Sequence, residues 1–166
     1  MTTLRIFGTA DDSIVDGPGI RFSVFTQGCK HACPGCHNPE AQAFGGGEEI
    51  NLDELKAKIE ANPLLAGITL TGGEPFEQAQ PLLELTLWAK QRGLNVWAYS
   101  GYLFEQLLVG VPSIWARRLA MAVDVLVDGP FIQDQMSLEL KWRGSANQRI
   151  IDIPASLAAG KVLELG

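Results

Sequence analysis

Three cysteines lie within eight residues of one another, and they are the only cysteines among the 166 residues of the chain. Cys29, Cys33 and Cys36 form the pattern C-x3-C-x2-C. Three thiolates can hold three corners of a metal centre and leave a fourth corner open, where a substrate can bind. The spacing therefore indicates chemistry at a metal centre, and the odd number of cysteines argues against a disulfide framework.

Two kinds of metal centre fit this spacing. Three cysteines on one short loop suit three irons of a four-iron cube, with the fourth iron free. The same cysteines together with His31 or His37 would complete a tetrahedral zinc site of three sulfur ligands and one nitrogen ligand. Spacing alone leaves both centres open, whereas a buried, unligated role for all three thiols is disfavoured.

Gly72-Gly73-Glu74-Pro75 forms a second group of candidate residues. The composition predicts a strand-to-helix turn, in which glycine supplies a positive φ and proline begins the helix. Paired glycines also let the backbone approach a ligand closely, and the carboxylate of Glu74 could bind an ammonium group.

Acidic residues mark two further turns. Asp16-Gly17-Pro18-Gly19 is a turn by composition, and Asp16 and Arg21 flank the strand that leads to the cysteines. Asp128 ends an apolar strand, where an acid needs a partner, and this makes it a mild site candidate.

The elements that must position these residues alternate between strands and helices. Apolar, β-rich runs that end at glycine predict strands, and apolar positions at helical spacing with capping residues predict helices. The expected strands are 20–26, 67–71, 94–99, 123–127 and 149–153, and the expected helices are 52–61, 77–92, 102–109 and 112–121.

This alternation predicts an α/β fold with parallel strands and right-handed crossovers. A full eight-stranded barrel needs about 250 residues, so a partial, open parallel β/α barrel of about six strands fits better, with a small doubly wound sheet as the alternative. In both, ligands gather at the carboxyl ends of the strands. The cysteines, Gly72-Gly73-Glu74, Ser100-Gly101 and Asp128-Gly129 each follow an expected strand, so we expect them on one rim.

The composition is that of an ordinary globular protein, and we expect residues 1–166 to form a single domain. A formal net charge of −6 disfavours nucleic acid as a partner. No apolar run reaches the roughly 20 residues of a membrane span, and residues 1–5 lack the apolar stretch of a signal peptide. We therefore expect no membrane partner and a cytoplasmic location, where thiols stay reduced.

With the cysteine pattern and the Gly72-Gly73-Glu74-Pro75 turn both in view, the chain resembles the radical S-adenosylmethionine superfamily. The run Val15-Asp16-Gly17-Pro18-Gly19-Ile20-Arg21-Phe22, followed by Gln27-Gly28-Cys29, is similar to the activases of glycyl-radical enzymes. The segments 125–131 and 143–150, the second reading RGSANQRI, look specifically like the activating proteins of anaerobic (class III) ribonucleotide reductase. The resemblance covers about residues 5–153.

The resemblance implies that the three cysteines bind a [4Fe–4S] cluster whose open iron is chelated by S-adenosylmethionine. Reductive cleavage would give a 5′-deoxyadenosyl radical, which removes a hydrogen atom from a backbone glycine of the reductase. A flavodoxin or ferredoxin would donate the electron. The cofactor carries this chemistry, so no general acid or base is required.

The resemblance also implies roles for residues beyond the cysteines. Gly72, Gly73 and Glu74 would cradle the amino end of the methionine. By looser analogy, Ser100 and Asp128 would line the cofactor or cation pocket, and Asp16 and Arg21 would face the glycine loop of the partner.

One position departs from the superfamily pattern, which often has an aromatic residue before the third cysteine to pack on the adenine. Here that residue is Gly35, so another group, such as His37 or Tyr99, must hold the adenine. Three alternatives remain open: activation of another glycyl-radical enzyme such as pyruvate formate-lyase, a small-molecule reaction like that of the deazapurine-forming members, and a non-catalytic zinc-binding module.

Overall fold

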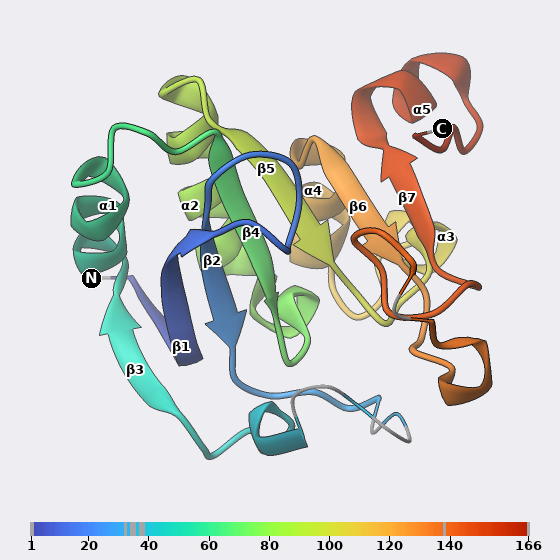
Figure 1. Ribbon diagram of the computed structural model, residues 1–166, viewed down its shortest axis with the longest axis horizontal. Coiled ribbons are helices and arrows are strands. Elements are labelled where there is room, and N and C mark those ends of the chain that lie inside the picture. Colours follow the sequence, from blue (N-terminus) through green and yellow to red (C-terminus); the bar gives the residue numbers. More distant parts are fainter. Residues whose placement is uncertain (1, 32, 34–35, 37–38, 138, 166) are drawn as a thin grey trace.

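The computed structural model describes residues 2–31, 33, 36, 39–137 and 139–165. Within these described residues, seven strands form one sheet in the order β3-β1-β2-β4-β5-β6-β7 (Figure 1). The strands are β1 (Thr3–Ser13), β2 (Arg21–Thr26), β3 (Glu48–Asn51), β4 (Gly67–Gly72), β5 (Asn95–Tyr99), β6 (Val125–Asp128) and β7 (Arg149–Asp152).

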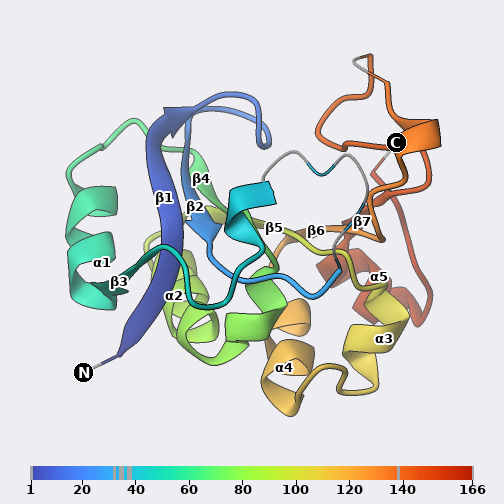
Figure 2. The same cartoon turned by 90° about the horizontal axis from the view of Figure 1, so that it is seen from below.

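The helices are α1 (Leu52–Glu60), α2 (Ala79–Gln91), α3 (Phe104–Leu108), α4 (Ile114–Ala122) and α5 (Ile153–Ala159), with short 3-10 turns η1 (Pro39–Ala41), η2 (Pro75–Gln78) and η3 (Gln133–Gln135). Helices α2, α3 and α4 lie on one face of the sheet, while the β1–β2 connection and the described residues of the segment 129–148 (129–137 and 139–148) extend over the other (Figure 2). None of the helices in the described part of the chain has the length and apolar character that a bilayer span requires.

The prediction of parallel strands is confirmed for β2, β4, β5 and β6, which form the centre of the sheet. It is wrong for the flanks, because β1, β3 and β7 pair antiparallel, and the described sheet has seven strands. Antiparallel neighbours can be joined by short turns, whereas parallel neighbours need a crossover of a dozen or more residues. The turn 14–20 between β1 and β2 is too short for a crossover helix.

Along each central strand, successive side chains point alternately to the two faces of the sheet, and one of these faces packs on the core. Phe22 and Val24 of β2, with Ile68 and Leu70 of β4, are buried in the main core together with apolar residues of α1, α2 and α4. The alternate residues of β2, β4 and β5 point to the other face and are polar or aromatic: Ser23, Phe25, Thr69, Thr71, Trp97 and Tyr99.

The two edge strands of the sheet are protected from further strand pairing in different ways. Strand β3 forms one edge; it is only four residues long, and Glu48 and Glu49 are exposed on it. Strand β7 forms the other edge, and the C-terminal segment covers it through backbone hydrogen bonds from Leu165 N to Ile150 O (2.8 Å) and from Asp152 N to Leu163 O (2.9 Å).

Candidate functional site

A cavity of about 400 Å³ lies at the carboxyl ends of the central strands. Phe25, Thr71 and Tyr99 from the polar face of the sheet contribute to its wall, and the segment 129–148 closes one side. All three cysteines line it, as do Gly72, Gly73, Ser100, Gly101 and Gly129. The expectation that these turns share one rim is confirmed. Parallel strands bring their carboxyl ends to the same edge of a sheet, which is why the turns meet there.

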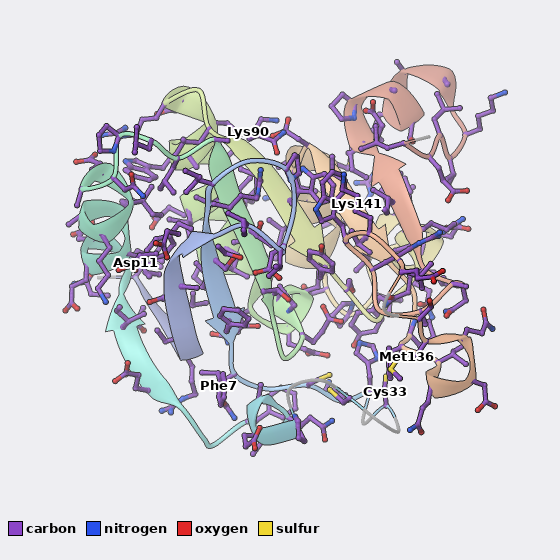
Figure 3. All side chains as sticks on the ribbon, in the orientation of Figure 1. Phe7, Asp11, Cys33, Lys90, Met136 and Lys141 are labelled. Atoms are coloured by element: carbon purple, nitrogen blue, oxygen red, sulfur yellow. The ribbon has the colours of Figure 1, made fainter. Side chains whose placement is uncertain are left out.

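The cysteines lie on a loop that leaves β2 and returns through η1, beyond the carboxyl ends of β2 and β4 (Figure 3, where Cys33 is labelled). Backbone hydrogen bonds close its base, from Gly28 N to Ala41 O (2.6 Å) and from Cys29 N to Gln42 O (3.0 Å). The amide of Gln27 donates to the carbonyls of Glu40 and Ala43 at 2.9 and 2.6 Å. The loop is therefore held at its base, and its three cysteines line the cavity.

The donor set fits an iron–sulfur cluster. Cys29, Cys33 and Cys36 are each half-buried and none forms a disulfide. Within the described residues, no three His, Cys, Asp or Glu side chains lie close enough together to hold a single ion. A cube binds each thiolate to a different iron and so accepts ligands that are spread around one cavity. The ring of His31, one of the two histidines considered for a zinc site, hydrogen-bonds through Nε2 to Glu74; His37 lies outside the described residues.

Gly72 and Gly73 allow β4 to turn against the base of the cysteine loop. Gly72 has φ +101°, and a Cβ there would collide with the backbone of β2. A Cβ on Gly73 would meet the carbonyl oxygens of Gly28 and Ala41, the latter at 2.7 Å. The backbone N–H of Gly73 donates to Thr26 O at 2.7 Å. These glycines are needed for close backbone packing, and the same packing puts their bare backbone on the cavity wall.

Glu74 is fully buried, and protein groups surround its carboxylate. Oε1 accepts from His31 Nε2 at 2.6 Å and from the N–H of Gly101 at 2.8 Å, and Oε2 accepts from the N–H of Phe76 at 3.0 Å. The hydroxyl of Ser100 lies 3.0 Å from both oxygens. Ser100 lines the cavity, whereas Glu74 lies behind its wall.

His31 connects the cysteine loop to this carboxylate. The hydrogen bond that His31 donates to Glu74 raises the pKa of His31 above its ordinary value, against the opposing effect of burial. Its ring meets that of Tyr102 edge-on, with centroids 4.5 Å apart. The sequence shows His31 only as a possible zinc ligand, because its partner is 43 residues away in the chain.

Asp128 is also fully buried and has protein partners. Its carboxylate accepts from Phe104 N at 2.8 Å, at the start of α3, and from the guanidinium of Arg149, whose pKa it raises. The following residue, Gly129, lines the cavity, whereas Asp128 does not border it. The sequence-based inference that this acid needs a partner is thus confirmed, and the partner is Arg149.

Asp16 borders the cavity mouth, where Ser13 and Ser23 donate to its Oδ2 at 2.8 and 2.9 Å. Arg21, in contrast, is fully buried at the opposite end of β2, so the expectation that it faces a partner is wrong. Its guanidinium donates to Pro18 O, Thr69 Oγ1, Ile68 O and Asn95. Burial lowers its pKa to about 10.

The sequence did not single out the segment 129–148 as a cavity wall. The side chain of Gln148 accepts from Gly144 N at 2.8 Å and donates to Gly129 O at 3.0 Å, which folds the segment back on itself. Phe131, Trp142 and Arg143 of this segment line the cavity. Tyr99, one of the two groups considered for holding the adenine, lines it as well; Gly35 and His37 lie outside the described residues.

Comparison with known proteins first defines the class. The sequence profile of the family described as a 4Fe-4S single cluster domain matches residues 15–151. Three similar proteins each bear the name anaerobic ribonucleoside-triphosphate reductase-activating protein. The one from Vibrio cholerae is 35% identical over 146 residues, and the one from Haemophilus influenzae is 33% identical over 147. Each of these alignments covers 82% of this chain and 90% of the relative.

The third, from Enterobacteria phage T4, is 33% identical and covers 82% of this chain and 86% of its own. This chain therefore belongs to the family of anaerobic ribonucleoside-triphosphate reductase-activating proteins. Among solved structures, QueE from Escherichia coli aligns with 60% of this chain and 53% of its own, at 15% identity and a TM-score of 0.45, a likeness too weak to argue from.

Proposed function

We propose that this chain is an activating enzyme that holds a [4Fe–4S] cluster on Cys29, Cys33 and Cys36, binds S-adenosylmethionine beside it, and generates a glycyl radical on anaerobic ribonucleotide reductase. One observation carries the proposal: all three cysteines line a single cavity of about 400 Å³. That volume is within the range of small-molecule sites. When bound, the cluster and S-adenosylmethionine supply a 5′-deoxyadenosyl radical that removes a hydrogen atom from a glycine of the reductase.

The protein contributes binding, orientation and exclusion of water. The bare backbone of Gly72 and Gly73 is where we place the methionine end of the cofactor. Tyr99 and Trp142 offer aromatic rings on the cavity wall for the adenine. Burial raises the pKa of Tyr99, so its phenol stays neutral near neutral pH. Asp16, at the mouth, remains our candidate for contact with the glycine loop of the reductase.

Two finer points belong to the same proposal. The open sheet, with its four central parallel strands, is proposed to be the partial barrel of the radical S-adenosylmethionine enzymes. A flavodoxin or ferredoxin type protein is proposed as the one-electron donor.

Anaerobic reconstitution with iron and sulfide tests the proposal. We expect about four irons per chain and, after addition of S-adenosylmethionine, a reductant and the reductase, the EPR doublet of a glycyl radical on the reductase. A Cys33→Ala variant, treated in parallel, should bind no stable cluster. One tightly bound zinc in a colourless protein would overturn the proposal, and a cluster with a radical only on another glycyl-radical enzyme would overturn the choice of partner.

A further inference from the structure

We propose that Glu74 is a positioning residue that acts through His31 to hold the cysteine loop against the carboxyl ends of the strands. We call the pair, with the Ser100-Gly101 turn that supports it, the Glu74–His31 latch. The inference rests on the proposed function, because the held loop carries the three proposed cluster ligands, but the contacts that define the latch are present in the chain itself.

The hydrogen-bonding capacity of Glu74 is filled within the protein. A carboxylate offers about four lone-pair sites. Four donors occupy them: His31 Nε2, the Ser100 hydroxyl, and the backbone N–H groups of Gly101 and Phe76. The side chain is 0% exposed, and Glu74 is absent from the cavity wall. An ammonium group in the cavity would have to displace one of these donors, so the carboxylate serves the protein rather than the cofactor.

The ring of His31 packs closely against Gly101 and Tyr102. A Cβ on Gly101 would lie 2.5–2.8 Å from three ring atoms of His31, so only glycine lets the ring settle there. Tyr102 packs edge-on against the ring from the next position in the chain. Beside the latch, Lys30 pairs with Glu77 at 3.6 Å, and Glu77 accepts from the hydroxyl of Tyr102 at 2.6 Å. Neighbouring residues of the cysteine loop thus contact both acids of the turn that follows β4.

The location of His31 explains what the latch does. His31 lies between Cys29 and Cys33 in the sequence, so its hydrogen bond anchors the loop at a point between two of the cysteines. The base of the loop is held separately by Gln27, Gly28 and Cys29. Without the latch, the base would remain attached while the thiol-bearing part moved relative to Gly72-Gly73 and Ser100.

Two variants and a matched control test the latch. In His31→Ala and Glu74→Gln, we expect the reconstituted cluster to lose iron to a chelator faster by on the order of tenfold. His31→Ala removes the hydrogen bond, and Glu74→Gln replaces one acceptor oxygen with an NH2 donor among groups that are all donors. Glu60→Gln, which changes an exposed carboxylate on α1 that pairs with Arg92, should lose iron at the parent rate. The double variant should lose iron no faster than the faster of the two single variants, since the His31–Glu74 contact is affected by both substitutions.

A second readout needs no cluster. Amide hydrogen exchange of the iron-free chain should be faster at residues 30, 31 and 33 in His31→Ala and Gly101→Ala than in the parent, with unchanged exchange in β4 and β5. If Glu74→Gln does not fold, as judged by circular dichroism, these two variants decide the matter.

The outcomes separate the latch from the proposed function. If Glu74 instead binds the cofactor, the Glu74→Gln variant will retain its iron and will lose only the change that S-adenosylmethionine makes in the EPR spectrum of the reduced cluster. The His31→Ala variant will then behave like the parent. That pair of results would overturn the latch. If the parent binds no cluster, the proposed function fails and amide exchange in the variants alone decides. Unchanged exchange at residues 30, 31 and 33 then refutes the latch, and faster exchange there supports it.

Discussion

Arg21 shows how a charged residue can serve the framework of a site without reaching it. Its guanidinium is fully buried and has only uncharged hydrogen-bond acceptors, four of them within 3.0 Å on Thr69, Ile68 and Asn95. It also donates to Pro18 O at 2.9 Å. The arginine therefore fastens the Asp16–Gly19 turn to β4 and β5, and this turn carries Asp16 to the cavity mouth.

Replacing this arginine should be costly for stability. We expect Arg21→Met to lower the free energy of unfolding by about 2–4 kcal/mol, because buried acceptors lose a charged donor and only the volume of the side chain is restored. Arg117→Met, on the exposed face of α4, is the matched control and should change it by less than about 0.5 kcal/mol. Urea titration measures both, and equal losses would show that the buried hydrogen bonds contribute little.

Residue types alone identified part of the site. The cysteine spacing and the glycines after β4 marked the cavity correctly, because each depends on local chain properties: ligand spacing and positive φ. The partners of Glu74, Asp128 and Arg21 could not be predicted from local pattern. His31 is 43 residues from Glu74 and Arg149 is 21 residues from Asp128, so only the fold brings them together.

At the scale of elements, Arg149 joins β7, β6 and α3. It is the first residue of β7, and its guanidinium binds Asp128 at the end of β6 and Glu105 in the first turn of α3. Asp128 also accepts from the backbone N–H of Phe104, where α3 begins. This network positions the edge strand β7 next to the segment 129–148, which precedes β7 in the sequence and lines the cavity.

The ion pair between Arg149 and the exposed Glu105 predicts that the stability of the protein depends on pH. Arg149 lowers the pKa of Glu105 below its ordinary value of 4.5. A carboxyl whose pKa is lowered by folding stabilises the protein above its unfolded pKa and loses that contribution as the pH falls below it. Since the Glu105 side chain is 60% exposed, Glu105→Gln should cost less than about 1 kcal/mol at pH 7.

The difference in free energy of unfolding between Glu105→Gln and the parent should shrink as the pH falls from 4.5. Chemical unfolding at pH 7, 5 and 3.5 measures it. A gap that stays constant over this range would mean that the ionised form of Glu105 is not what stabilises the network.

The central strands could be predicted from the sequence because their alternating or continuous apolar runs end at glycine. Strand β1 could not, since its second half, Gly8–Ser13, is largely small and polar and gains its order by pairing with β2. The same holds for β3, where Ile50 is the single buried residue of four. Antiparallel pairing at the flanks follows from connection lengths and tertiary contacts, which strand propensity does not contain.

At the scale of the whole molecule, the apolar core and the cysteine loop are on different parts of the structure. The main core consists of residues from β1 to β6, β7 and the helices, and none of its buried members lies between residues 25 and 49. A chain of this size buries enough surface to fold without a metal. Folding should therefore precede the loading of iron.

This separation gives a direct prediction for the iron-free protein. Chelated parent protein and the Cys33→Ala variant should keep the far-ultraviolet circular dichroism of the loaded protein and unfold cooperatively. Loading should raise Tm only by the binding contribution of the cluster. Loss of secondary structure on removing iron would contradict this view and would make the cluster part of the folding core.

The protection of both sheet edges affects how the iron-free protein should behave in solution. Unpaired strand edges are templates for aggregation, and proteins suppress this with short strands, charges or a covering segment. Here β3 is short and presents Glu48 and Glu49, and the C-terminal segment pairs with β7. A molecule whose cluster is destroyed by oxygen would thus keep both edges protected, so it should stay dispersed and available for repair instead of joining edge-to-edge fibrils.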